Sequence, residues 1–161
     1  METQLKEQFH LAFYDLIKEA VLTENHDYIV LLYTEIRDRL ARLLRKEGRA
    51  HRRLQEAFDV PFFEQQLRHR AFDANSMTSL VATTFSWIHN LQMPLRDSAT
   101  ALAKQRVQES GTSLAEVVPV YIKEAHGCLD TMEQDQKEFD ENREHPVVQE
   151  MLRRAVASCA L

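Results

Sequence analysis

The sequence predicts an all-α protein, and two observations support that prediction. Apolar residues recur every three or four positions through most of the 161 residues, a spacing that places them on one face of a helix. The chain has only three glycines and four prolines, about a third of their usual combined share. Folds with many tight turns need more of both residues. We therefore expect a single domain over residues 1–161, a bundle of six to eight helices.

The first two predicted helices have clear apolar faces. The face of the first consists of Leu5, Phe9, Phe13, Leu16 and Ala20. It is expected to end at Asn25 or His26. The face of the second consists of Ile29, Leu32, Tyr33, Ile36, Leu40, Leu43 and Leu44. Gly48 is expected to end this second helix, and the four-residue spacing of Glu35 and Arg39 favours a local ion pair along it.

The middle of the chain contains two helix starts. Asp59 precedes Val60-Pro61, an arrangement typical of an N-cap before a short helix that ends near Phe72. Asn75 or Ser76 is expected to cap the next helix. The apolar face of that helix consists of Met77, Leu80, Val81, Thr84, Ile88 and Leu91.

Three prolines mark the helices in the remainder of the chain. Pro94 predicts a boundary followed by a helix from Leu95 to about Glu109. Ser113 and Glu116 have capping-box spacing. The helix after them has the apolar stripe Val117, Tyr121, Ala125, Leu129 and Met132. Pro119 predicts a kink or a late start in this helix. The polar composition of residues 133–144 predicts a connection between helices. Pro146 predicts the start of the last helix.

Composition and charge limit the classes of function. The net charge of −5 argues against a general nucleic-acid binder. The N-terminus carries charges among its apolar positions, unlike a secretory signal, and no uncharged apolar run approaches the length of a membrane span. Cys128 and Cys159 lie far apart, as expected for a reducing compartment. These features predict a cytoplasmic protein.

Motifs for catalysis are absent from the sequence. There is no glycine-rich phosphate loop, zinc-protease helix or serine-hydrolase elbow. Glu7 and His10 have the spacing of a di-iron helix, but the second such motif that this architecture needs is missing. His126 and Cys128 are two residues apart without the spacing of a zinc site. We therefore expect no enzymatic activity, no cofactor and no metal. A helical-bundle enzyme or metal protein is the last alternative, after the two binding functions described next.

Charge is unevenly distributed along the chain. Residues 37–53 hold eight basic and two acidic residues, and residues 130–144 hold seven acidic and two basic residues. Both segments are either solvated helix faces or functional surfaces. In the functional interpretation, the basic segment binds an acidic or phosphorylated protein through Arg42, Arg45, Lys46, Arg49, Arg52 and Arg53.

Two questions about this basic segment stay open. Nucleic acid is the alternative partner, disfavoured because no aromatic residue lies among the arginines for base stacking. The two charged segments can pair within one chain or between two, so a homodimer is compatible with each function.

Three elements between Tyr28 and about Met132 resemble a known family. The first is the helix with Leu32, Glu35 and Ile36, followed by a basic linker. The second, at residues 54–73, is LQEAFDVPFFEQQLRHRAFD. The third, at residues 93–100, is MPLRDSAT, in which Pro-x-Arg-Asp follows an apolar helix. In this order the elements resemble the T-complex protein 11 family, which is all-helical.

The resemblance implies a non-enzymatic regulatory or scaffold protein linked to cyclic-AMP and protein-kinase-A signalling. No catalytic residue is attributed to the family. Its members are usually several times longer, so this chain is expected to be either a divergent short member or a fragment. A fragment is expected to leave an apolar face exposed where the missing helices would pack. The motif residues to follow in the structure are Asp59, His69, Asp73, Pro94, Arg96 and Asp97.

These motif residues also have a physical interpretation. Asp59 and Asp73 suit helix N-termini, and Asp97 suits the first turn of a helix. Arg96 is expected to make a tertiary ion pair, with a ligand contact as the alternative. His69 belongs either to the basic surface or to a buried hydrogen bond.

Overall fold

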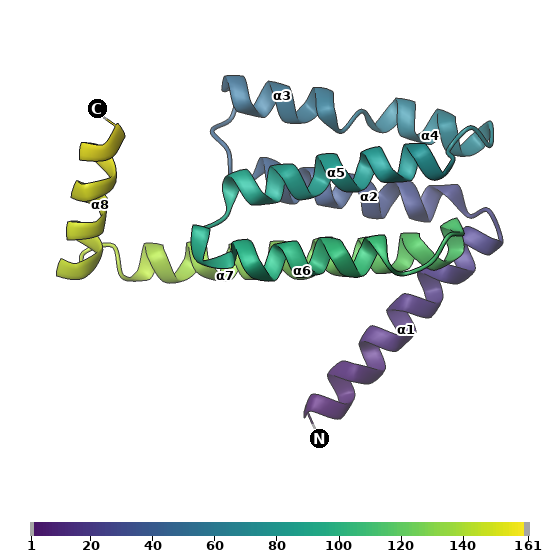
Figure 1. Ribbon diagram of the computed structural model, residues 1–161, viewed down its shortest axis with the longest axis horizontal. Coiled ribbons are helices and arrows are strands. Elements are labelled where there is room, and N and C mark those ends of the chain that lie inside the picture. The colour runs from purple at the N-terminus through teal and green to yellow at the C-terminus, as the bar shows by residue number, and fades with distance from the viewer. Residues whose placement is uncertain (1, 160–161) are drawn as a thin grey trace. The chain divides into compact units, whose positions relative to one another are not determined.

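The protein is all-helical, as the sequence predicts. The structure, a computed structural model, describes residues 2–159 without the side chains of residues 155, 156, 158 and 159, so the thiol of Cys159 lies outside the described residues. Within residues 2–159 there are eight α-helices, one 3-10 helix and no strand (Figure 1). They are α1 (Glu2–Leu22), α2 (His26–Ala41), α3 (Arg49–Ala57), α4 (Val60–Arg68), α5 (Ala74–Leu91), η1 (Pro94–Arg96), α6 (Asp97–Gln108), α7 (Leu114–Glu141) and α8 (Pro146–Cys159).

The chain divides into two compact units. The first unit, residues 1–129, contains α1 to α6 and the first half of α7. The second unit, residues 130–161, contains the end of α7 and α8. The expectation that residues 1–161 form one domain stays a prediction.

Helix α2 is central to the first unit, where it packs against α1, α3 and α4. The Asn25 side chain caps it by accepting the N–H of Tyr28 at 3.4 Å. Its buried residues are five of the seven predicted: Ile29, Leu32, Tyr33, Ile36 and Leu40.

The predicted end of α2 is wrong. The helix stops at Ala41, because the N–H groups of Leu43 and Leu44 bond to carbonyls only three residues back and tighten the chain into a turn. Leu43 and Leu44 are half-buried in this turn. Gly48 is the N-cap of α3 instead of the stop of α2.

The predicted apolar face of α1 is largely exposed. Only Ile17 and Ala20 of this helix are buried. Leu5, Phe9 and Leu16 are 55%, 70% and 54% exposed. Figure 1 shows the N-terminal part of α1 extending away from the other helices of the first unit. The spacing of apolar residues therefore predicts the helix correctly. It does not predict that most of the apolar face of α1 is left uncovered by the other described residues.

An aromatic cluster joins α2 to the α3–α4 region. The Tyr33 ring lies 5.6 Å from that of Phe58 and 4.2 Å from that of Phe63, measured between centroids. Phe63 meets Phe72 edge-on at 5.3 Å. Burial, together with nearby Asp59, raises the pKa of the Tyr33 phenol well above its usual value, so the cluster is uncharged.

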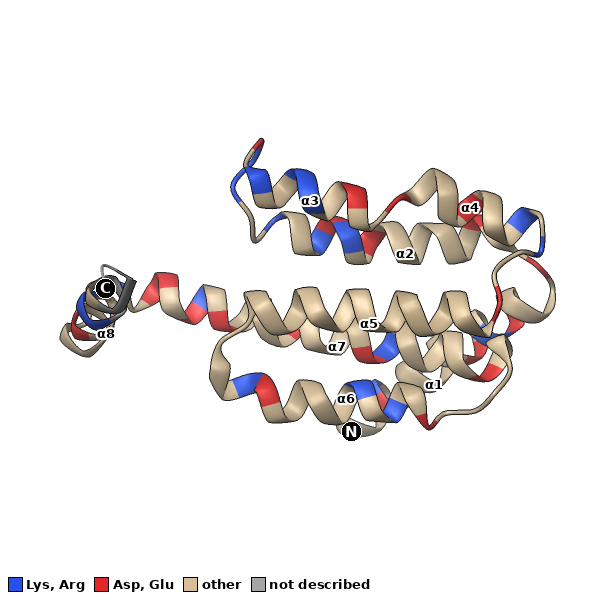
Figure 2. Ribbon diagram, turned by 45° about the horizontal axis from the view of Figure 1, so that its top comes forward, with Lys and Arg blue, Asp and Glu red and all other residues tan. Residues whose placement is uncertain are grey.

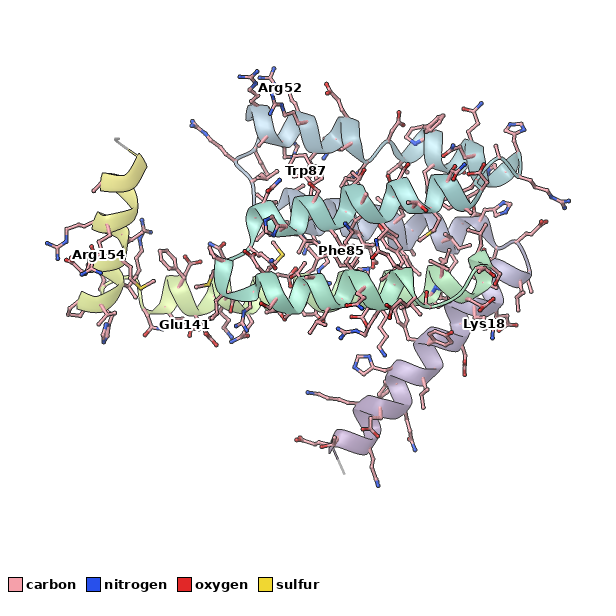
Figure 3. The ribbon with its side chains drawn as sticks, viewed as in Figure 1. Lys18, Arg52, Phe85, Trp87, Glu141 and Arg154 are labelled. Atoms are coloured by element: carbon pink, nitrogen blue, oxygen red, sulfur yellow. The ribbon has the colours of Figure 1, made fainter. Side chains whose placement is uncertain are left out.

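Helix α5 packs against α6. The hydroxyl of Thr84 on α5 is hydrogen-bonded to the hydroxyl of Tyr121 on α7. The predicted face residues Met77, Val81, Thr84 and Ile88 are buried. Phe85, which sequence analysis did not place in the core, is also buried, and Figure 3 shows it pointing into the first unit. Asp73 caps α5 rather than Asn75 or Ser76, because its carboxylate reaches the N–H of Ser76 at 2.8 Å.

Helix α7 begins as a capping box predicts. The Ser113 hydroxyl accepts the N–H of Glu116 at 3.3 Å and donates to the Glu116 carboxylate at 2.7 Å. The helix starts five residues before Pro119, so the predicted late start is wrong. Proline is tolerated this near a helix N-terminus because few intrahelical bonds are lost there.

The second unit is more helical than the sequence predicts. The polar stretch that begins at residue 133 continues α7 as far as Glu141, with Gln134 donating to Glu138 one turn later at 3.0 Å. Pro146 starts α8 as predicted, and His145 Nδ1 accepts the N–H of Val147 at 3.2 Å. Across the described residues, no helix combines the length and apolar character needed to cross a bilayer.

Candidate interaction surface

The six predicted partner-binding residues gather at one end of the first unit. Arg42, Arg45 and Lys46 lie in the turn after α2, and the other three lie on the first turns of α3. All six are exposed. Figure 2 shows basic residues concentrated along this turn and the start of α3. We call these residues the basic surface: Arg42, Arg45, Lys46, Arg49, Arg52 and Arg53.

Local structure explains why the α3 arginines point outward. Arg52 and Arg53 follow Arg49 by three and four residues, so the three side chains share one side of the helix. Leu54 on the other side of α3 is fully buried and anchors the helix. In Figure 3 the Arg52 side chain extends from α3 away from the neighbouring helices. Burying Leu54 thus presents the three guanidinium groups to solvent.

The basic surface has no acidic partner among the described residues of the first unit. Within residues 2–129 of the first unit, no carboxylate lies within 4.0 Å of these six side chains. Arginines elsewhere do pair: Arg68 lies 2.7 Å from Asp27, Arg70 lies 3.2 Å from Glu24, and Arg106 lies 3.0 Å from Glu124. The positive charge of the basic surface is therefore not neutralised by carboxylates in the described part of the first unit.

Two other arginines of the basic segment have structural contacts instead. Arg37 on α2 lies 3.1 Å from Asp38. Arg39 is half-buried, and its Nη1 lies 2.8 Å from Nδ1 of His126 on α7. The Arg39 side chain is thus directed to a neighbouring helix and not along α2 to Glu35. The structure separates the arginine-rich segment into these two packed residues and the six exposed ones.

The acidic segment, residues 130–144, belongs to the second unit. It covers the end of α7 and the start of the turn before α8. Its pairing with the basic segment, within one chain or between two copies, stays a prediction.

Three motif residues lie at helix ends. The Asp59 carboxylate accepts the N–H of Phe62 at 3.1 Å, so it caps α4 as predicted. Hydrogen bonds from Ser76 to the Asp73 carboxylate hold the pKa of Asp73 below its usual value. His69 is exposed at the C-terminus of α4 and so belongs to the surface, not to a buried hydrogen bond.

The Pro-x-Arg-Asp motif closes the turn between α5 and α6. Pro94 begins η1, and Asp97 is the first residue of α6. The Asp97 carboxylate accepts the Gln92 amide at 3.0 Å and lies 3.4 Å from Nδ1 of His89. Gln92 in turn accepts the hydroxyl of Thr100 at 2.6 Å.

This network gives the motif a structural role that sequence analysis missed for Gln92, His89 and Thr100. His89 lies on α5, Gln92 follows that helix directly and Thr100 lies on α6. In the sequence, only the polar Gln92 directly after an apolar helix could have indicated the network. Arg96 is half-buried beside the network, and its predicted tertiary ion pair stays a prediction.

The candidate chemical residues are not brought together. Glu7 and His10 are exposed on the N-terminal part of α1. Cys128 is half-buried, and burial raises the pKa of its thiol, which opposes the thiolate form that a nucleophile needs. In the part of the chain that the structure describes, no three His, Cys, Asp or Glu residues are placed to hold a metal ion.

The fold and the surface together define an all-helical protein whose first unit presents a concentrated positive surface, with no neutralising carboxylate in the described part of that unit. The family model of T-complex protein 11 matches residues 1–150, so the chain belongs to this family. The match is wider than the resemblance between Tyr28 and Met132 and includes α1. No curated protein matches the chain, and no solved structure matches it either.

Proposed function

We propose that this protein is a non-enzymatic regulatory or scaffold protein of the cytosol, linked to cyclic-AMP and protein-kinase-A signalling. Its basic surface binds an acidic or phosphorylated segment of a protein partner. One observation carries the proposal: six exposed cations have no carboxylate within 4.0 Å in the described part of the first unit, whereas Arg68, Arg70 and Arg106 of the same unit all have one. Family membership supports the signalling context.

The physical argument concerns like charges held together. Six neighbouring positive charges repel one another in the free protein, and a bound anion relieves that repulsion. Five of the six are arginines, whose planar guanidinium groups form paired hydrogen bonds with carboxylates and phosphates. Binding of this kind weakens as salt screens the charges.

The test is charge reversal of the surface. Arg45→Glu, Arg49→Glu, Arg52→Glu and Arg53→Glu in one chain should abolish partner recovery in a pull-down from nuclease-treated cytosolic extract. The same chain should lose affinity for a fluorescent deca-glutamate peptide at low salt. Circular dichroism should show an unchanged helical fold, because all four side chains are exposed.

A matched control carries the same charge change elsewhere. Lys6, Lys18, Lys123 and Lys137 are also exposed, and reversing these four to glutamate should leave recovery and peptide affinity unchanged apart from a modest general effect. If both variants lose the partner equally, net charge and not the basic surface is responsible. If recovery from untreated extract disappears after nuclease treatment, the nucleic-acid alternative replaces the protein partner.

A further inference from the structure

A pocket opens on the first unit at the end opposite to the basic surface. The start of α5, the end of α6 and the start of α7 meet there and line a pocket of about 360 Å³ that is open to solvent. In Figure 1 these helix ends lie at the other end of the bundle from the turn between α2 and α3. The pocket is thus independent of the surface assigned to partner binding.

The walls of the pocket are mainly apolar and fixed in place. Met77, Val81 and Val107 are buried core residues that form its floor. Leu114 and Val117 of α7 are half-buried and complete the wall. Apolar surface left in contact with water costs about 25 cal/mol for each Å². A ligand that covers these side chains would recover that free energy.

We propose that this pocket binds a small, uncharged and mainly apolar molecule. No charged side chain lines it; its polar lining side chains belong to Thr78, Gln108, Thr112 and Ser113. An anionic group placed there would lose hydration with no positive charge among the lining side chains to compensate. The volume is near the lower end of small-molecule sites, about 300–1,000 Å³.

Two of the polar side chains are already engaged. The Thr78 hydroxyl donates to the carbonyl of Ala74 at 2.9 Å, and the Ser113 hydroxyl donates to Glu116 at 2.7 Å. Among the described residues, the side chains of Gln108 and Thr112 make no hydrogen bond. They can therefore receive one neutral polar group, such as a hydroxyl, at the end of an apolar body.

Glu116 and Gly111 make the pocket selective against anions. A side chain at Gly111 would collide with the Glu116 side chain, so the carboxylate lies directly beside this wall residue. Its negative charge repels an anionic ligand. The pocket should therefore discriminate between an alcohol and a carboxylate of the same chain length.

The experiment uses the full chain and the neutral fluorophore N-phenyl-1-naphthylamine. Its fluorescence should rise on binding and fall when 1-decanol displaces it. Decanoate should need at least about a tenfold higher concentration, because it would bury an unpaired negative charge close to Glu116. Equal displacement by 1-decanol and decanoate would overturn the proposal, as would a failure of the fluorophore or of 1-decanol to bind.

Variants locate the binding. Thr78 is exposed at the rim, so Thr78→Phe should fill the opening and weaken binding of the fluorophore and 1-decanol at least about tenfold without disturbing the core. Ser79→Phe is the matched control, because Ser79 is the next residue of α5, also exposed, and does not line the pocket. Its affinity should stay as in the unmodified protein.

A third variant separates the pocket from the exposed face of α1. Phe9→Gln removes the most exposed aromatic residue of that helix and should leave binding unchanged. Loss of binding in Phe9→Gln, or unchanged binding in a folded Thr78→Phe variant, would place the fluorophore outside the pocket and refute the proposal. Circular dichroism confirms that each variant is folded before it is scored.

Discussion

The hydroxyl groups of Thr84 and Tyr121 lie 2.8 Å apart in the core of the first unit. Thr84 belongs to α5 and Tyr121 to α7, and both are almost fully buried, with exposed fractions of 0% and 1%. Each hydroxyl satisfies the other, so neither is left without a hydrogen bond in an apolar environment. Burial raises the pKa of the Tyr121 phenol well above its usual value, which keeps this pair neutral.

Removing one member of this pair should destabilise the protein. Thr84→Val preserves shape but leaves the Tyr121 hydroxyl without its partner, at a cost of about 1–3 kcal/mol in the free energy of unfolding. Tyr121→Phe should cost a similar amount. In the double variant both hydroxyls are gone, so urea denaturation should show a loss smaller than the sum of the two single losses. Strictly additive losses would mean that the two hydroxyls are not coupled.

Arginines of the same segment should differ sharply in their effect on stability. Arg39→Ala removes the contact between the half-buried guanidinium and His126 of α7 and should cost about 1–3 kcal/mol in the free energy of unfolding. Arg42→Ala is the control, because Arg42 is exposed, and its cost should stay within about 0.5 kcal/mol. Equal effects in urea denaturation would contradict the separation of packed from exposed arginines.

The two glycines of the α6–α7 region should respond in opposite directions to alanine. Gly111 has a φ of +151°, and a Cβ there would collide with Glu116, so Gly111→Ala should cost about 1–3 kcal/mol. Gly127 lies within α7, where a Cβ meets nothing within 4 Å, so Gly127→Ala should stabilise by about 0.5–1 kcal/mol. Thermal denaturation of both variants measures the contrast, and a shift of the same sign in both would refute it.

Sequence analysis predicts what depends on neighbours in the chain. It predicts the N-caps at Asp59 and Asp73 and the capping box at Ser113, because each of them depends on a hydrogen bond between residues only three positions apart. The end of α2 was not predictable, because the apolar spacing continues through Leu43 and Leu44 although the backbone there tightens into a turn. Exposure of α1 in particular was not predictable either, because periodicity shows where an apolar face lies and not what covers it. For the candidate site, exposure of the six basic residues agrees with the sequence. Contacts such as that of Arg39 with His126 span 87 residues and have no local signal.

Asp73 should contribute to the acid sensitivity of folding. Its pKa is lowered in the folded state by the hydrogen bonds from Ser76, so its contribution to stability is present above its ordinary pKa. That contribution is lost as the pH falls through the lower folded-state value. Asp73→Asn keeps a cap without this titration, so its unfolding midpoint should fall less steeply than that of the unmodified protein between pH 5 and pH 2. Parallel pH profiles from thermal denaturation would show that the cap is not linked to the pH dependence.

The exposed face of α1 should contribute little to the stability of the isolated chain. Leu5→Gln, Phe9→Gln and Leu16→Gln together remove side chains that are more than half exposed, so each change should cost no more than about 0.5 kcal/mol in the free energy of unfolding. Ile17→Ala, one position beyond Leu16, empties a fully buried site and should cost about 2–5 kcal/mol. Urea denaturation at low protein concentration measures both. A loss in the triple variant as large as that of Ile17→Ala would mean that this face is covered in solution, either by another part of the chain or by a second copy, and repeating the measurement over a range of protein concentrations distinguishes the two, because only the second depends on concentration.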